Sequence, residues 1–169
     1  MPCPIPSGSE EQTLRCFSGS LNYNSMRNII IGSDHAGFDL KEECRQFLLK
    51  DPAYYVFDQG VYDRQSADYP DIAKKVSLAV LSGEYEKGIL ICGSGIGMSM
   101  TANRFKGIRA ALCHDLYTAR LSRQHNDANI LVMGGRVIGA GLALEMVEIF
   151  LNTGFEGARH KRRIDMIDC

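Results

Sequence analysis

A cysteine followed by alternating glycines is the stretch of this chain best suited to chemistry. Residues 91–100 read ICGSGIGMSM, in which Cys92 ends an apolar run and Gly93, Gly95 and Gly97 follow at every second position. Backbone N–H groups free of side-chain bulk can converge on an oxyanion, and a helix N-terminus favours a nearby thiolate. The pattern therefore predicts a thiol that moves protons beside a turn that stabilises negative charge. The alternative is an inert buried cysteine, with glycines that only allow close packing of helix and sheet.

Three familiar signatures do not fit these loops. A GxGxxG dinucleotide fingerprint needs a third glycine where Met98 or Met100 stands, and a P-loop needs Lys-Ser/Thr after Gly37, where the chain has Phe38-Asp39. A phosphatase of the Cys-x5-Arg type needs an arginine at position 98. Nicotinamide binding, nucleotide hydrolysis and phosphocysteine chemistry are therefore not supported.

Two histidines and a basic tail carry the other reactive groups. His35 follows Asp34 directly after an apolar run, whereas His125 stands in SRQHND toward the end of an expected helix. A histidine at a helix C-terminus can be a simple cap, so both interpretations of His125 stay open. Arg159 and Arg163 are spaced i, i+4 and would share one side of a helix. Two guanidinium groups on one side suit a bound phosphate, although a run of charges can also be a solvated surface.

These residues need a scaffold, and the chain repeats one from Met26 onward. Apolar runs predict strands at residues 27–32, 54–58, 88–92, 108–113 and 130–133, and apolar stripes at helical spacing follow at residues 40–48, 72–80 and 142–150. Runs that are apolar throughout predict strands buried on both faces, which in a strand-helix alternation means a parallel sheet covered by helices. Because such sheets bind ligands at the carboxyl ends of their strands, we expect Asp34, His35 and Cys92 at one edge.

Composition limits the partners. The chain has 169 residues, 45% of them apolar, and a formal net charge of −1. This suffices for one domain with a single core and does not indicate a nucleic acid or an anionic membrane as partner. No segment approaches the roughly 20 apolar residues of a membrane span. Six cysteines without a C-x2-C pair indicate a reducing cytoplasm and argue against structural zinc.

The first 25 residues differ from the rest. They are rich in Ser, Pro, Gly and Asn without periodicity, and they lack the basic and apolar regions of a secretory signal. We expect a disordered N-terminal extension over residues 1–25 and a folded domain over residues 26–169.

Five strings along the chain together resemble one known family. They are GSDHAGFDLK, ADYPDIA, GILICGSGIGMSMTANRFKGIRAALC, LSRQHNDANILVMGGRVIG and FEGARHKRRI, in this order between Met26 and Ile164. They closely resemble ribose-5-phosphate isomerase of the B type, a family that includes galactose-6-phosphate and allose-6-phosphate isomerases. Residues 1–25 have no counterpart in the family pattern.

The resemblance implies a fold, a reaction and an assembly. The fold is a Rossmann-like three-layer α/β/α sandwich with a central five-stranded parallel sheet. The reaction is the interconversion of D-ribose 5-phosphate and D-ribulose 5-phosphate in the cytoplasmic, non-oxidative pentose phosphate pathway, with no cofactor and no metal. The assembly is a homodimer with active sites at the subunit interface, and whether dimers pair into tetramers stays open.

The resemblance also implies catalytic roles. Cys92 corresponds to the general base that moves a proton between C2 and C1, and Ser94 stands where many members have the Thr that shuttles protons between O1 and O2. His125 corresponds to the histidine that opens the furanose ring from the opposite subunit. Members without the cysteine use a glutamate at the position of Met98, which cannot accept a proton, so Cys92 has no visible substitute here.

Further residues correspond to the binding groups of the family. Asp34 matches the acid that binds sugar oxygens, and Asn126 contacts the sugar from the same opposite subunit as His125. Arg136 matches an arginine contributed across the interface. The phosphate ligands are thus His35, Arg136, Arg159 and Arg163. The backbone of the turn forms the anion hole for the enediolate, with Gly93, Ser94, Gly95, Ile96 and Gly97.

Two alternatives remain open from the sequence. The substrate could be a six-carbon sugar phosphate, such as allose 6-phosphate or galactose 6-phosphate, and the depth of the pocket between Asp34, Tyr69 and the phosphate arginines would decide. The chain could also be a non-catalytic module that binds phosphosugars, although such a module has no reason to keep Cys92, His125 and the glycine turn together.

Overall fold

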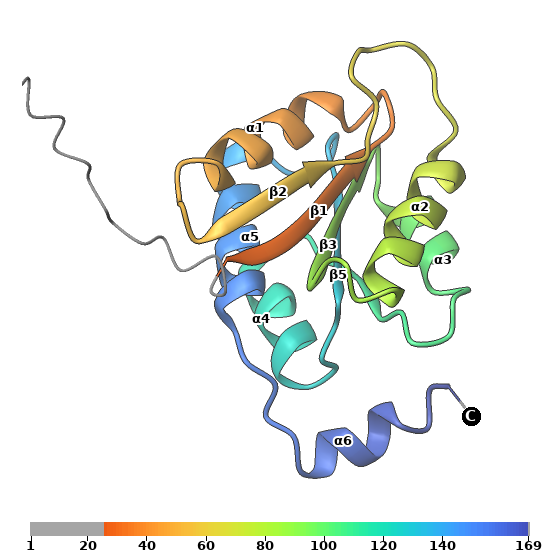
Figure 1. Cartoon of the computed structure of the whole chain (residues 1–169), viewed down its shortest axis with the longest axis vertical. Coiled ribbons are helices and arrows are strands. Elements are labelled where there is room, and N and C mark those ends of the chain that lie inside the picture. Colours follow the sequence, from red (N-terminus) through yellow and green to blue (C-terminus); the bar gives the residue numbers. More distant parts are fainter. Residues whose placement is uncertain (1–25, 169) are drawn as a thin grey trace, which may run out of the picture.

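The computed structural model describes residues 26–168, so the extension predicted for residues 1–25 lies outside the described residues. Strands and helices alternate along the chain (Figure 1). The strands are β1 (Arg27–Ser33), β2 (Tyr54–Asp58), β3 (Lys87–Cys92), β4 (Ala110–Leu112) and β5 (Ile130–Gly134). The helices are α1 (Phe38–Leu48), α2 (Tyr69–Leu81), α3 (Ile96–Ala102), α4 (Leu116–Gln124), α5 (Ala140–Asn152) and α6 (Arg159–Ile164). Between residues 26 and 168, none of these helices is long and apolar enough to cross a membrane.

The five strands form one parallel sheet in the order β2-β1-β3-β5-β4. From β1 the chain turns to one side to reach β2, whereas from β3 it crosses to the other side to reach β4. The carboxyl ends of the neighbouring strands β1 and β3 therefore form the switch point at which α/β sheets bind ligands. The predicted five-stranded parallel sheet is confirmed.

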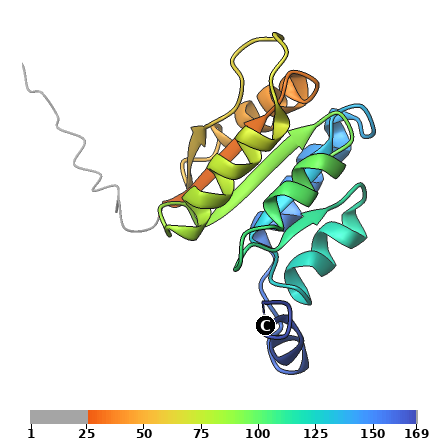
Figure 2. The same ribbon diagram turned by 90° about the vertical axis from the view of Figure 1, so that its right-hand side faces the viewer.

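Alternate side chains of the strands build two core layers. Ile29 and Ile31 of β1 belong to the layer under α1, α4 and α5, while Ile30 of the same strand and Cys92 of β3 belong to the layer under α2 and α3. Figure 2 shows α2 and α3 together on one side of the sheet. Because both faces are covered, these strands are apolar throughout instead of alternating with polar residues.

The edge strand β4 is shorter than the predicted run of residues 108–113. Its exposed backbone is paired by a side chain, because the Asn103 amide accepts from the Ala110 N–H at 2.9 Å and donates to the Ala110 carbonyl at 2.9 Å. The N–H of Arg109 is likewise taken by the Asn129 side chain at 2.8 Å. Asn103 thus replaces ladder bonds at the free edge and Asn129 does so on the side of β5, which an apolar run could not indicate.

Helix α4 runs between the two ends of the strands, which we call the carboxyl edge and the amino edge of the sheet. It begins after β4 with Asp115 as its cap, whose Oδ1 accepts from the Thr118 N–H at 2.8 Å. It ends at His125, whose N–H donates to the Leu121 carbonyl at 2.9 Å. Nine helical residues span about 14 Å, so Asp115 lies at the carboxyl edge of the strands and His125 toward the amino edge.

Candidate active site

A cleft of about 700 Å³ opens at the switch point of the sheet. Its walls come from the loops after β1, β3 and β5 and from the first turns of α2 and α3. The lining residues are Asp34, His35, Ala36, Tyr69, Cys92, Gly93, Ser94, Ile96, Gly97, Met100, Arg136 and Val137. The structure therefore brings together the predicted base, the glycine turn and part of the predicted substrate site.

The Cys92 thiol is held by the backbone of the glycine turn. Its Sγ accepts a hydrogen bond from the Gly95 N–H at 3.1 Å, and the side chain is buried. Gly95 has a φ of 79°, and a Cβ there would lie 2.4 Å from Leu112 Cδ1. Only glycine fits this position without strain. The turn thus points a backbone donor at the sulfur.

The other described cysteines are chemically different. Burial raises the pKa of the Cys44 thiol to about 12, and the charge of Glu43 adds to the effect. Burial also raises the pKa of Cys113. Neither residue lines the cleft. Of the three free cysteines among residues 26–168, Cys92 is therefore the one placed to exchange protons with a ligand.

Asp34 and His35 are oriented by backbone donors. Asp34 Oδ1 accepts from the N–H groups of Ala36 at 2.9 Å and Gly37 at 3.0 Å, which fixes the loop after β1. His35 Nδ1 accepts from the Ala67 N–H at 3.3 Å. A ring nitrogen that accepts leaves the proton of a neutral imidazole on the other nitrogen, so Nε2 is the donor of His35, which lines the cleft.

Tyr69 forms the outer wall against the glycine turn. A Cβ on Gly97 would lie 2.5 Å from Tyr69 Cε2, so the missing side chain at position 97 allows the ring to pack on the first turn of α3. The residue is still 40% exposed. Tyr69 thus lines the cleft, and whether it limits the length of a ligand is the question that the sequence left open.

Arg136 lies in the same cleft as Cys92 of its own chain. Its N–H donates to the Gly93 carbonyl at 3.0 Å, and its Cδ lies 3.6 Å from the position of a Gly93 Cβ. The expectation that Arg136 reaches the site across an interface is therefore wrong for this arrangement: the loop after β5 delivers it directly, because β5 inserts beside β3.

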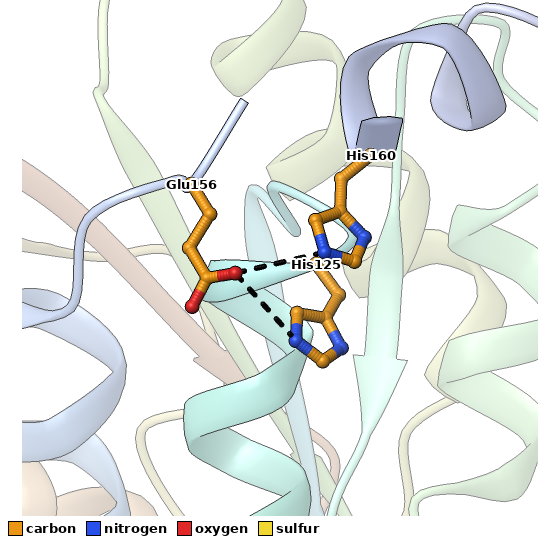
Figure 3. Close-up of side chains that lie close together, drawn as sticks. All are labelled: His125, Glu156 and His160. Atoms are coloured by element: carbon orange, nitrogen blue, oxygen red, sulfur yellow. Dashed lines mark ion pairs between the residues drawn. The ribbon is translucent and has the colours of Figure 1, made fainter. Parts of the chain in front are cut away.

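The predicted His125 lies in a second place together with Glu156 and His160, a group that we call the histidine cluster (Figure 3). The His125 and His160 rings stack with centroids 4.2 Å apart and planes 6° apart. Glu156 Oε2 lies 3.8 Å from His125 Nε2 and 3.6 Å from His160 Nε2. Arg159 and Arg163 share the short helix α6 with His160, which confirms that the arginine pair lies on a helix.

The histidine cluster and Cys92 lie at opposite ends of the strands, Cys92 at the carboxyl edge and the cluster at the amino edge. Cys92 ends β3, whereas His125 ends α4 near the start of β5. The six residues of β3 rise roughly 17 Å. In Figure 1 the strand arrows point away from α6. One chain therefore does not bring His125, Arg159 or Arg163 to its own Cys92.

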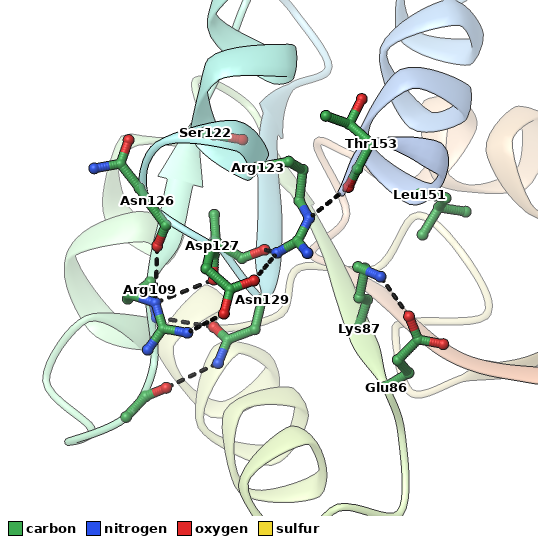
Figure 4. Close-up of polar contacts among 12 residues, drawn as sticks. Glu86, Lys87, Arg109, Ser122, Arg123, Asn126, Asp127, Asn129, Leu151 and Thr153 are labelled. Atoms are coloured by element: carbon green, nitrogen blue, oxygen red, sulfur yellow. Dashed lines mark hydrogen bonds and ion pairs between the residues drawn. The ribbon is translucent and has the colours of Figure 1, made fainter. Parts of the chain in front are cut away.

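The loop that follows His125 is braced by a polar network (Figure 4). Asp127 has a φ of 45° and its carboxylate lies 2.8 Å from Arg123 Nη1 and 3.2 Å from Arg109 Nη2. Arg109 Nε also donates to the Asn126 carbonyl at 2.9 Å. Asn126 borders a separate hollow of about 200 Å³. The network fixes the backbone on which His125 and Asn126 are presented.

Sequence reasoning missed the partners Glu156, His160, Arg109 and Asp127. Glu156 and His160 stand four residues apart in EGARH, but they do not share a helix, because α6 begins at Arg159. The contacts of Arg109 and Asp127 join segments that are distant along the chain. Among residues 26–168, the histidine cluster is also the group whose ligand atoms, within 4.8 Å of one another, could hold a metal ion.

Fold and cleft together define the class of the protein. The site is a thiol and a glycine turn at the switch point of a parallel α/β sandwich. The family model described as Ribose/Galactose Isomerase matches residues 29–167 of this chain. The chain therefore belongs to the ribose/galactose isomerase family.

Individual relatives narrow the comparison. The chain is 46% identical over 142 residues to ribose-5-phosphate isomerase B of Escherichia coli (strain K12), which covers 84% of this chain and 95% of the relative. The crystal structure of a ribose 5-phosphate isomerase from Thermotoga maritima matches with 55% identity and a TM-score of 0.82, over 84% of this chain and 97% of the other. A 4-deoxy-4-sulfo-D-erythrose isomerase of Clostridium sp. (strain MSTE9) is 45% identical over 128 residues, 75% of this chain and 80% of the relative.

Proposed function

We propose that this chain is an aldose-ketose isomerase that interconverts D-ribose 5-phosphate and D-ribulose 5-phosphate in the non-oxidative pentose phosphate pathway. The observation that carries the proposal is the hydrogen bond between the Cys92 sulfur and the glycine turn at the switch point of the sheet. Relatives named ribose-5-phosphate isomerase over nearly their whole length support the choice of substrate. Three free cysteines among the described residues support a reducing, cytoplasmic location.

The proton transfer needs a base and a stabilised intermediate. The Cys92 thiolate takes the proton from C2 of the open-chain aldose, and the C1 carbonyl becomes an enediolate. The thiol then returns a proton to C1 while C2 becomes the carbonyl, so the substrate is neither oxidised nor reduced overall and no redox cofactor is required. Backbone N–H groups from Gly93 to Gly97 stabilise the enediolate charge, and the Ser94 hydroxyl moves the proton between O1 and O2.

The substrate is held at its non-reacting end. His35 and Arg136 in the cleft, together with Arg159 and Arg163 of α6, bind the phosphate, and Asp34 binds sugar oxygens. Binding energy at the phosphate fixes C1 and C2 against Cys92. Opening of the furanose ring is a separate proton transfer, which we assign to His125, with Asn126 beside it on the sugar.

The site is completed by a second copy of the chain. Cys92 and His125 lie at opposite edges of the sheet, so the histidine and α6 that serve one Cys92 come from a partner subunit. In a symmetric dimer each chain gives both halves and two equal sites result. The proposal is thus a homodimer with active sites at the interface.

A second substrate class has its own support. The family model is described for ribose and galactose isomerases, and a relative at 45% identity is named for a four-carbon sulfosugar. Related sites in this family therefore accept different chain lengths and anionic groups. Tyr69, at the outer wall of the cleft, is the residue that we expect to limit chain length here.

The experiment compares three sugars with the purified protein: D-ribose 5-phosphate, D-allose 6-phosphate and D-galactose 6-phosphate. Ketose formation is followed without added metal, and kcat/KM is compared. The proposal predicts the highest kcat/KM for ribose 5-phosphate. A higher value for either hexose phosphate would support the six-carbon alternative, and no turnover of any of the three by folded protein would support a non-catalytic binding module.

A further inference from the structure

His160 joins two groups that the proposed reaction needs. Its ring is buried and lies flat against the His125 ring, with centroids 4.2 Å apart. Its Nε2 accepts a hydrogen bond from Arg159 Nε at 3.4 Å. One side chain therefore contacts both the proposed ring-opening histidine, which Figure 3 shows beside it, and a proposed phosphate ligand.

The bond from Arg159 defines the charge state of His160. A guanidinium N–H can only donate, so the nitrogen that accepts from it carries a lone pair and the imidazole is neutral. Burial lowers the pKa of His160, and the neighbouring His125 and Arg159 lower it further. Arg163 acts in the same direction and Glu156 in the opposite one. His160 is thus a flat, uncharged acceptor at neutral pH.

The backbone docks this unit onto the end of α4. The Glu156 N–H donates to the Gln124 carbonyl at 3.0 Å, directly before His125. A tight turn follows, with φ of 68° at Gly157 and 47° at Ala158, and α6 begins at Arg159. The position of α6 relative to His125 is therefore set by backbone bonds as well as by the stacked rings.

A metal ion is a weaker use of the same cluster. The His160 Nε2 that would bind the ion already accepts from Arg159, and a guanidinium cation beside the site repels a metal cation. The parallel rings add a second obstacle, because a metal must lie near the plane of each imidazole that binds it, and two stacked planes do not meet. The geometry favours positioning over metal binding.

We propose that His160 is a positioning residue that sets the ring plane of His125 and the direction of the Arg159 guanidinium as one unit. The inference rests on the proposed function of His125 and Arg159. In a dimer this unit reaches the partner's cleft together, so ring opening and phosphate binding are brought to the partner's Cys92 in a fixed relation.

Two substitutions separate the two contacts. His160→Phe keeps a flat ring under His125 but removes the acceptor for Arg159. His160→Gln places an amide oxygen near the former Nε2 but removes the stacked ring. Lys161→Ala is the matched control, since Lys161 is exposed on the same helix and pairs with Asp165. Urea midpoints of all variants establish that each is folded.

The first readout is phosphate binding, which does not depend on turnover. Inorganic phosphate is titrated into each protein by calorimetry. Loss of a hydrogen bond that orients a charged ligand group predicts about tenfold weaker binding in His160→Phe, with His160→Gln and Lys161→Ala close to wild type. Equal weakening in both His160 variants, or in neither, would overturn the assignment for Arg159.

The second readout separates ring opening from proton transfer. D-ribulose 5-phosphate cannot form a five-membered ring because its 5-hydroxyl is esterified, so exchange of its C1 hydrogen in D₂O reports on proton transfer at Cys92 without ring opening. If His125 loses its position in His160→Gln, isomerisation of ribose 5-phosphate should be about tenfold slower, while C1 exchange of ribulose 5-phosphate is nearly retained. Parallel loss of exchange and isomerisation would overturn the role at His125. Absence of exchange in wild type would instead count against the proposed function, while the phosphate titration would still decide the contact to Arg159.

Discussion

The carboxyl and amino ends of the strands, the two edges compared above, present their functional groups in different ways. At the carboxyl edge, Cys92 is buried and is positioned by a backbone N–H from a turn that only glycine can form. At the amino edge, His125 has a side chain 35% exposed and is positioned by side chains of α6 and of the preceding segment. The proposed base is thus positioned by backbone, whereas the groups that we propose to meet a partner subunit are positioned by side chains at a more exposed surface.

The largest effect is expected at the carboxyl edge. Cys92→Ser keeps the approximate size of the side chain but replaces the thiol by a hydroxyl, which is a far weaker acid. General acid-base groups contribute about 10²–10⁴-fold, so kcat for ribose 5-phosphate should fall by that order with KM nearly unchanged. Steady-state kinetics of the variant test this. A kcat within tenfold of wild type would mean that another group takes the C2 proton.

The next effect belongs to the amino edge and acts on binding. Arg159→Ala removes a guanidinium from the proposed phosphate clamp, and hydrogen bonds to charged groups predict a KM raised about tenfold or more. Lys161→Ala, on the same helix, should leave KM unchanged. A fall in kcat with unchanged KM in Arg159→Ala would contradict phosphate binding by this residue.

The free energy of unfolding should show how tightly the glycine turn at the carboxyl edge is packed, by comparison with a glycine in open space. Gly95→Ala adds a Cβ at 2.4 Å from Leu112 Cδ1 on a backbone with φ of 79°, and we expect it to destabilise the fold by about 3 kcal/mol. Gly83 has φ of 78° but nothing within 4 Å of its Cβ position, so Gly83→Ala should cost only about 1 kcal/mol. Urea unfolding measures both, and equal losses would mean that the turn around Cys92 is not tightly packed.

The smallest effect concerns the helix that links the edges. The backbone N–H of Thr118 lowers the pKa of the Asp115 carboxylate, and the Thr118 hydroxyl adds to this. A carboxylate with a lowered folded pKa stabilises the fold at pH values above its unfolded pKa and loses that contribution as pH falls through the folded one. Asp115→Ala should therefore lower the melting temperature at pH 7, and the difference from wild type should shrink below about pH 4. A constant difference down to pH 2 would exclude the charged cap.

Much of this arrangement could be predicted from the sequence. Runs such as Ile29–Ile31 and Ile89–Ile91 are apolar throughout because helices cover both faces, so strand positions and the parallel sheet follow from local pattern. The placement of Asp34, His35 and Cys92 at one edge then follows from the rule that loops after parallel strands meet.

The rest depends on order and distance, which local patterns do not contain. The insertion of β5 between β3 and β4 is decided by global packing, and it alone puts Arg136 beside Cys92. The stacking of His160 on His125 joins residues from α6 and the end of α4. The sequence positions of His125 and His160 do not indicate this contact. The motif strings therefore pointed to His125 and Arg159 but not to His160, which contacts both.

In the proposed dimer, one active site combines Cys92 of one chain with His125 of another. The Cys92→Ala and His125→Ala proteins, each expected to be inactive alone, are mixed in equal amounts and allowed to exchange subunits. Each mixed dimer has one site with both wild-type groups, so random pairing predicts recovery of about a quarter of wild-type activity on ribose 5-phosphate. Activity that stays at the sum of the two separate variants, with mixed dimers present by native mass spectrometry, would contradict the shared site.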